Sequence, residues 1–215
     1  MATTTTSTII RPRTDADLPE CATILRAVHA ISGYPVGGME DPLRFLRTDD
    51  RAWVAVRDAD ADADDGSSNT STTTATTAAS TTTPSSSGSL IVGHAALSKA
   101  SERDVAAALW RRLHPSRGGG EKDREEEEED IMVLGRLFVR PDARGGGVAV
   151  RLIETAVAEA RGRGARLVLL ALVKDQPAIR LYRKLGWSHF GTTVYRWREG
   201  GEEREMDGEC FVSPE

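Results

Sequence analysis

The sequence predicts an α+β fold, a mixed α/β arrangement in which helices flank one central sheet. Apolar residues recur at helical spacing in some segments and form short runs of strand length in others. The segments follow one another as strand, helices, strand, strand, insertion, strand, helix, strand, helix, strand, strand. The 39% hydrophobic residues are concentrated outside two polar stretches, which is enough for one core. We therefore expect a single domain over residues 7–215 after a disordered N-terminus over residues 1–6.

The first elements are a strand, a helix, a short helix and a second strand. Ser7–Pro12 has the apolar content of a strand, and Asp15–Ile31 carries apolar residues at helical spacing. Thr14 or Asp15 can cap that helix. A short helix begins at Asp41, and a strand is expected around Ala52–Val56.

Two polar stretches interrupt the chain. The first, at about residues 58–89, is an Asp/Ala repeat followed by a Thr/Ser/Ala tract, and the second, at about residues 115–130, ends in a run of glutamates. Neither can bury enough apolar surface to offset its ordering entropy, so both are expected to be disordered insertions. Between them we expect a strand over Leu90–Leu97 and an amphipathic helix over Ser101–Leu113 with Ser101 as its cap.

The second half begins with two strands and the helix between them. Ile131–Val139 is a strongly apolar strand that Pro141 stops, and a helix is expected from Gly147 to about Arg161. Leu167–Val173 is a continuous apolar run of strand length. Such a run indicates a strand that is buried on both faces.

A helix and two strands complete the predicted fold. Asp175–Leu185 reads as a helix because Asp175 can cap it, its apolar residues share one face and Gly186 can end it. Strands are expected near Ser188–Trp197 and Glu209–Val212.

Composition excludes several classes of protein. The net charge of −5 and the pI near 5.5 argue against nucleic-acid binding, which needs clustered Lys and Arg. Cys21 and Cys210 are far apart and lack metal-ligand spacing, so neither a metal site nor a disulfide framework is expected. No 18-residue apolar run and no signal peptide occur. We expect a cytoplasmic protein without a membrane partner, and the sequence leaves a nuclear location and a homodimer open.

A glycine-rich turn between a strand and a helix is the most informative segment. Three glycines, Gly145, Gly146 and Gly147, precede the helix, so several backbone N–H groups can converge at the positive end of its dipole. Such a turn binds phosphate, and Arg144 adds a permanent positive charge. The glycines alone leave a plain tight turn open as an alternative. Neither the P-loop nor the dinucleotide motif is present.

Two motifs in this half resemble the GNAT superfamily of N-acetyltransferases. Arg144-x-x-Gly147-x-Ala149 is similar to the family's Arg/Gln-x-x-Gly-x-Gly/Ala signature. Downstream, Asp175-x-x-Ala178-x-x-x-Tyr182-x-x-x-Gly-Trp is similar to the family's Asn-x-x-Ala-x-x-x-Tyr-x-x-x-Gly-Phe. The resemblance extends more loosely over the whole ordered chain.

The resemblance implies a fold, a cosubstrate and a binding site. It implies a mostly antiparallel sheet in which a parallel pair of strands, Ile131–Val139 and Leu167–Val173, splays apart to admit acetyl-CoA. CoA is then the product, and no metal is implied. The implied cofactor-binding residues are Leu137, Phe138, Val139, Arg144, Gly145, Gly146, Gly147, Val148, Ala149, Asp175 and Ala178.

The resemblance also implies an acyl transfer in which Tyr182 is the catalytic proton donor. A phenol with a usual pKa of about 10 stays protonated at pH 7 and can serve a departing thiolate. Some relatives have a glutamate as general base on the strand before the signature, but Met132–Leu137 contains no carboxylate. Glu129, Asp130 and His94 are weaker candidates for the base.

The acceptor is expected to be a primary amine of a small molecule that attacks directly in a ternary complex. Tyr34, Pro35 and Phe45 are the candidate residues for the acceptor pocket, although ordinary loop packing explains them equally well. A protein or peptide acceptor is an alternative, because fold alone does not select the amine. A second alternative is a non-catalytic module that binds acyl-CoA.

Overall fold

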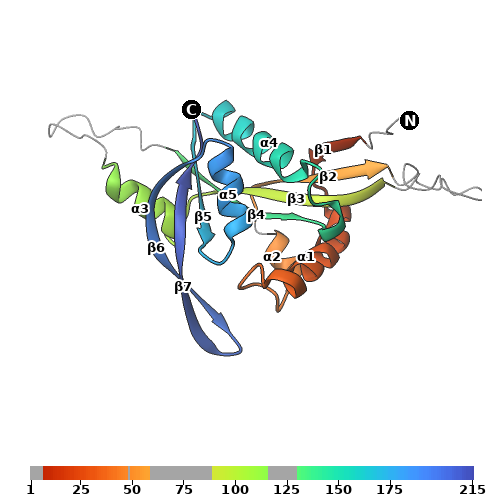
Figure 1. Ribbon diagram of the computed structural model, residues 1–215, viewed down its shortest axis with the longest axis horizontal. Coiled ribbons are helices and arrows are strands. Elements are labelled where there is room, and N and C mark those ends of the chain that lie inside the picture. Colours follow the sequence, from red (N-terminus) through yellow and green to blue (C-terminus); the bar gives the residue numbers. More distant parts are fainter. Residues whose placement is uncertain (1–6, 48, 59–88, 116–129) are drawn as a thin grey trace, which may run out of the picture.

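The computed structural model describes residues 7–47, 49–58, 89–115 and 130–215. Seven strands form one sheet, and helices cover both of its faces (Figure 1). The strands are β1 (Thr8–Pro12), β2 (Arg51–Asp58), β3 (Ser89–Lys99), β4 (Ile131–Val139), β5 (Arg166–Leu172), β6 (Ser188–Glu199) and β7 (Glu202–Val212). The helices are η1 (Asp15–Asp17), α1 (Leu18–Ser32), α2 (Pro42–Arg47), α3 (Val105–Leu113), η3 (Pro141–Ala143), α4 (Val148–Gly162) and α5 (Gln176–Lys184).

The sheet has the order β1-β2-β3-β4-β5-β7-β6, and every neighbouring pair except β4 and β5 is antiparallel. The parallel pair is joined only from Ile131–Arg166 to Val133–Val168. Beyond Val133 the two strands diverge. The expected fold class, a mostly antiparallel sheet with a splayed parallel pair, is therefore confirmed.

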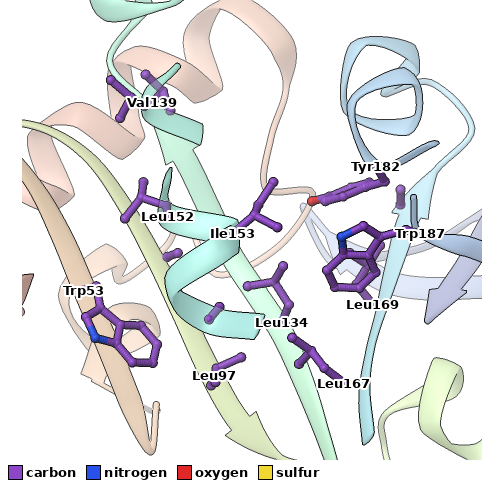
Figure 2. Packing of buried hydrophobic residues seen from close by; sticks show 14 of the residues in the cluster. Trp53, Leu97, Leu134, Val139, Leu152, Ile153, Leu167, Leu169, Tyr182 and Trp187 are labelled. Carbon is purple, nitrogen blue, oxygen red and sulfur yellow. The ribbon is translucent and has the colours of Figure 1, made fainter. Parts of the chain in front are cut away.

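Alternate residues along each strand pack on opposite faces of the sheet. On β2, Trp53 and Ala55 belong to the cluster under α4 and α5, whereas Val54 and Val56 belong to the cluster under α1 and α2. Figure 2 shows the first cluster, in which Leu152 and Ile153 of α4 lie over the sheet. A third cluster lies between α3 and the β5–β7 part of the sheet.

The strand β5 is buried on both faces, as its apolar run predicts. Leu167 and Leu169 pack in the α4 and α5 cluster, and Val168 packs in the α3 cluster. All three have at most 1% of their surface exposed. A strand with this environment has no polar face, so alternation of polar and apolar residues is absent from its sequence.

A glycine on β3 allows α4 to approach the sheet closely. A Cβ atom at Gly93 would lie 2.9 Å from Cγ1 of Val148 and 3.0 Å from Cδ1 of Leu152. These two residues belong to the first turns of α4. Gly93 therefore sets how near the N-terminus of α4 lies to the sheet, and any larger residue would push that helix end away.

The predicted elements differ from the observed ones mainly at their ends. The helix α3 begins at Val105 rather than Ser101, because Ser101 and Asp104 form a hydrogen-bonded turn before it. The last strand is longer than expected, since β7 begins at Glu202 and pairs along its whole length with β6. Charged side chains in this hairpin hide its strand character in the sequence.

The two expected insertions and the N-terminal residues 1–6 lie outside the described residues, apart from the ends of the insertions. Asp58 and Ser89 are the last residue of β2 and the first of β3. No helix in the described part of the chain is long and apolar enough to cross a membrane.

A partly buried ion pair joins β1 to the start of α1. Arg11 donates two hydrogen bonds of 2.7 Å to the Asp17 carboxylate, whose side chain is 9% exposed. The Thr14 amide and hydroxyl also donate to Asp17. These hydrogen bonds, that from Arg11 above all, lower the pKa of Asp17 to about 2.

The lowered pKa predicts a pH-dependent contribution to stability. It is present above pH 4 and is lost as the pH falls toward 2, since the unfolded carboxyl titrates near its usual value. Asp17→Asn should lower the free energy of unfolding by about 1–2 kcal/mol at pH 7, after allowance for the exposed side of Arg11, and by less at pH 3. Urea unfolding at both pH values measures this. Asp15→Asn, at an exposed neighbour, is the matched control, and an equal deficit of Asp17→Asn at both pH values would contradict the prediction.

Candidate functional site

A cleft of about 870 Å³ lies where β4 and β5 diverge. Its walls are β4, the turn before α4, the first turns of α5 and the C-terminal end of α1. Leu134 and Leu137 supply apolar surface from β4, and Leu170 and Ala171 supply it from β5. The cleft is therefore an apolar slot with polar groups at its two ends.

The turn before α4 presents backbone to the cleft. Gly145 and Gly147 have φ values of +84° and +74°, a region that glycine enters without cost, and both line the cleft. A Cβ atom at either residue would meet no other atom within 4 Å. Gly147 is the N-cap of the 15-residue helix α4, so the free N–H groups of this helix end face the same space. The turn thus has the geometry of an anion site.

Gly146 differs from its two neighbours. It does not line the cleft, and a Cβ atom there would lie 2.7 Å from Nη2 of Arg57 on β2. The guanidinium of Arg57 therefore packs behind the turn. Arg57 could not be found from the glycine motif, because it lies 89 positions before Gly146 and belongs to no local sequence pattern.

Arg144 is exposed at the cleft, and no described acidic group lies within ion-pair distance of it. Nearby, Arg140 is already paired with Asp142 at 2.7 Å. The charge of Arg144 is thus available to an anion. It adds to the helix dipole at the same end of the cleft.

The strand β4 contains a bulge opposite β3. His94 pairs with Phe138 and Ala96 pairs with Gly135, so β4 has one more residue than β3 between these pairs. Within the bulge, Arg136 has φ +49° and is the one non-glycine residue of the described chain with a positive φ. Its carbonyl oxygen is 2.9 Å from Nδ1 of His94.

His94 lies in a buried cluster of charged groups behind the bulge. Its side chain is fully buried, and Nε2 is 3.0 Å from Nη1 of Arg13. Burial lowers the pKa of His94 to about 4. The hydrogen bond to the Arg136 carbonyl opposes this shift, and the charges of Arg13 and Arg136 add to it, so the ring is neutral at pH 7. Asp49, whose side chain is fully buried, bonds to both arginines. His94, one of the weaker candidates for the general base, therefore does not line the cleft.

Tyr182 projects from α5 into the cleft. Its ring packs against Trp187 and Phe211 with centroid distances of 5.5 and 6.0 Å, and its hydroxyl points away from α5 toward α4 (Figure 2). It is 7% exposed, and burial raises the pKa of its phenol well above the usual range. The hydroxyl therefore stays protonated across the physiological range and is available as a donor.

The other end of the cleft is bounded by the end of α1 and the start of α5. Tyr34 lines it, and Lys174 closes it by donating hydrogen bonds of 2.9 and 3.1 Å to the carbonyls of Ser32 and Gly33. Asp175 is the one carboxylate among the residues that line the cleft, and burial raises its pKa. Its side chain makes no capping bond to α5, contrary to the expected role as a helix cap.

A family model described as "Acetyltransferase (GNAT) family" matches residues 76–187. The chain belongs to this family. It is 35% identical over 102 residues to the mycothiol acetyltransferase of Saccharomonospora viridis, a match that covers 46% of this chain. The match covers 31% of that relative, so the chain corresponds to about a third of its length.

Solved structures share the fold. Arabidopsis thaliana NAA60 in complex with acetyl-CoA superposes with a TM-score of 0.63 at 18% identity, covering 96% of this chain and 97% of that one. The NatC complex bound to Gag peptide and CoA gives a TM-score of 0.54 at 16% identity, covering 97% and 98% of the two chains. At these identities the likeness shows a shared GNAT fold.

The residues predicted from the GNAT motifs lie almost entirely in the cleft. Ten of the eleven predicted cofactor-binding residues line it, Gly146 being the exception, and Tyr182 lines it as well. Of the predicted acceptor residues only Tyr34 does, because Pro35 is buried and Phe45 packs under Arg136 at 4.6 Å. Asp130 does not line the cleft and pairs with Lys99, while Glu129 lies outside the described residues. Lys174 is a cleft residue that no motif indicated.

The glycine turn gives a test of the anion site. Gly147→Ala places a methyl group in the cleft and should weaken acetyl-CoA binding at least tenfold, because a diphosphate can approach this backbone only where no Cβ intervenes. Isothermal titration with acetyl-CoA measures the effect. Gly164→Ala is a matched control, since Gly164 has φ +68°, also meets open space and lies outside the cleft. Equal binding by the two variants would contradict an anion site at this turn.

Proposed function

We propose that this GNAT protein transfers the acetyl group of acetyl-CoA to a primary amine of a small molecule by direct attack in a ternary complex. The observation that carries the proposal is the divergence of β4 from β5 beyond Val133. It opens one continuous slot between a phosphate-type turn and a protonated tyrosine. A long, thin thioester with a charged end matches that slot.

The residues of the cleft suit each part of acetyl-CoA. The diphosphate would bind at Gly145, Gly147 and the start of α4, with Arg144 supplying charge. The pantetheine arm would lie along the open edge of β4, where backbone groups of residues 137–139 can pair with its amides as with an added strand. The apolar walls at Leu134 and Leu170 would exclude water from the thioester.

The bulge supports a donor for the thioester carbonyl. The peptide group between Arg136 and Leu137 is planar and trans, so the N–H of Leu137 points opposite to the carbonyl of Arg136. That carbonyl is directed to β3, where His94 bonds to it. The N–H of Leu137 is then directed to the other edge of β4, which β5 leaves unpaired. A backbone donor there would stabilise the oxyanion that forms during attack.

The chemistry moves one acyl group and one proton. The amine nitrogen attacks the thioester carbon, a C–N bond forms, the C–S bond breaks, and the sulfur departs as the thiolate. Tyr182 would donate a hydrogen bond to this sulfur, because its raised pKa keeps the phenol protonated. The proton that the amine loses balances the one that CoA gains on release.

The acceptor amine is cationic at neutral pH and must be the neutral base when it attacks. Asp175, the one carboxylate that lines the cleft, would attract the ammonium form and can accept its proton directly or through water. Burial raises the pKa of Asp175, which makes it a better base than an exposed carboxylate.

A contact between the β6–β7 hairpin and the loop after α1 supports a small acceptor. The β6–β7 hairpin reaches the loop after α1, where a Cβ atom at Gly37 would lie 4.0 Å from Cβ of Trp197. Tyr195 stacks on Trp197 along the same hairpin. This contact would restrict the room for an extended peptide between the hairpin and that loop.

The proposal predicts acetyl-CoA binding and an amine preference. Acetyl-CoA at a hundred times its dissociation constant should stabilise the protein by about 2.7 kcal/mol, which thermal melting detects. Release of CoA thiol should then occur with members of a panel of small primary amines and not with short peptides. Turnover with peptides alone would replace the small-molecule acceptor, and the absence of any melting shift at millimolar acetyl-CoA would exclude the enzyme.

The role of Tyr182 is tested by Tyr182→Phe. Loss of the hydroxyl should lower kcat roughly 10²- to 10³-fold, because the departing thiolate loses its donor while the ring packing is kept. The dissociation constant for acetyl-CoA should change less than threefold. Steady-state thiol release and titration separate the two effects. Unchanged kcat would remove Tyr182 from the reaction, and weakened binding alone would assign it to the cosubstrate pocket.

A further inference from the structure

The carbonyl of Arg136 is held in an unusual backbone conformation. A non-glycine residue at φ +49° costs roughly 1–2 kcal/mol, so surrounding contacts must hold it there. Its guanidinium bonds to the buried Asp49 and lies 4.6 Å above the ring of Phe45. Its carbonyl meets Nδ1 of His94 at 2.9 Å. The residue is therefore fixed at both its side chain and its carbonyl.

The neighbours of His94 determine its tautomer. Arg13 carries only donors, and its Nη1 lies 3.0 Å from Nε2 of His94. Nε2 must therefore be the acceptor, and the proton of the neutral ring is on Nδ1. From there it is donated to the carbonyl of Arg136. Arg13 is itself held by the carbonyl of Leu46, at 2.5 Å, and by Asp49.

We propose that His94 is a positioning residue for the acyl transfer. Its Nδ1–H holds the carbonyl of Arg136 and so directs the N–H of Leu137, on the other side of the same peptide group, at the thioester oxygen of acetyl-CoA. This inference rests on the proposed function. It assigns a role to a fully buried histidine that touches neither substrate.

The charge balance of the cluster explains why a neutral histidine is required there. Two arginines surround one carboxylate, so a protonated His94 would be a third cation and would add an unpaired buried charge. Burial and the charges of both arginines keep His94 neutral, against the opposing effect of its hydrogen bond to the Arg136 carbonyl. Burial raises the pKa of Asp49 to about 6, so the charge of the cluster changes near that pH and the contribution of His94 should be constant only well above it.

The first test uses the wild-type protein. Nitrogen-15 NMR of the labelled imidazole distinguishes a protonated Nδ1 from a protonated Nε2. We expect the Nδ1–H tautomer of His94, with the assignment made from its loss in His94→Asn. A protonated Nε2 would overturn the proposal, because the ring could then not donate to Arg136.

The second test compares two variants of equal polarity. The amide nitrogen of His94→Asn lies near the position of Nδ1 and can still donate to Arg136, whereas the amide of His94→Gln reaches the position of Nε2 and leaves that carbonyl without its donor. His94→Gln should lower kcat at least tenfold with acetyl-CoA, and His94→Asn should stay within about threefold of the wild type. Binding of CoA, which has no acetyl carbonyl, should be the same in all three proteins.

A vibrational readout separates positioning from a structural role. The carbonyl stretch of bound acetyl-CoA labelled with carbon-13 should shift to lower frequency in the wild type and in His94→Asn. In His94→Gln the frequency should return toward the value that the same carbonyl has in water-free solvent. The proposal would be overturned if both variants lost kcat equally and their carbonyl bands had the same frequency. A wild type that binds no acetyl-CoA would instead refute the proposed function, and this inference with it.

Discussion

The parallel pairing of β4 with β5 stops after three residue pairs, and the cleft exists because of that. The remaining residues of both strands cannot find ladder partners in each other, so their facing edges border an open slot. Both strands stay ordered because their other edges are paired, β4 with β3 and β5 with β7. The fold thus provides unpaired backbone inside a protein without unfolding a strand. The groups proposed to bind acetyl-CoA or to take part in catalysis all lie around this divergence.

The bulge opposite His94 and the buried cluster behind it hold the edge of β4 in its shape. Burying two arginines with one carboxylate carries a desolvation cost, so the cluster is poor evidence for stability by itself. Its members join four separate parts of the chain: the residue after β1, the loop before β2, β3 and β4. A role in fixing one backbone conformation at the bulge would account for this desolvation cost. The proposed oxyanion donor at Leu137 would require that conformation.

The electrostatic design of the cleft is asymmetric. The turn before α4 offers backbone N–H groups, a helix dipole and Arg144 at one end, and the region near Tyr182 offers an apolar wall with the Asp175 carboxylate beside Lys174. A ligand with an anionic end and a neutral thioester end therefore has one favourable orientation. The same asymmetry would separate the proposed diphosphate site at the glycine turn from the proposed acceptor site near Tyr182.

The sequence by itself indicated the elements, the glycine turn and about half of the residues that line the cleft, because each of these is a local pattern. The strand β5 is recognised by its apolar run, and Gly145, Gly147 and Tyr182 lie within two short motifs. The full length of β7 was missed because its exposed residues are mostly charged. Only the tertiary structure decided the cluster of Arg13, Asp49, His94 and Arg136, whose members lie up to 123 positions apart. Their roles follow from long-range packing and from a bulge in one strand, and neither is encoded in the spacing of neighbouring residues.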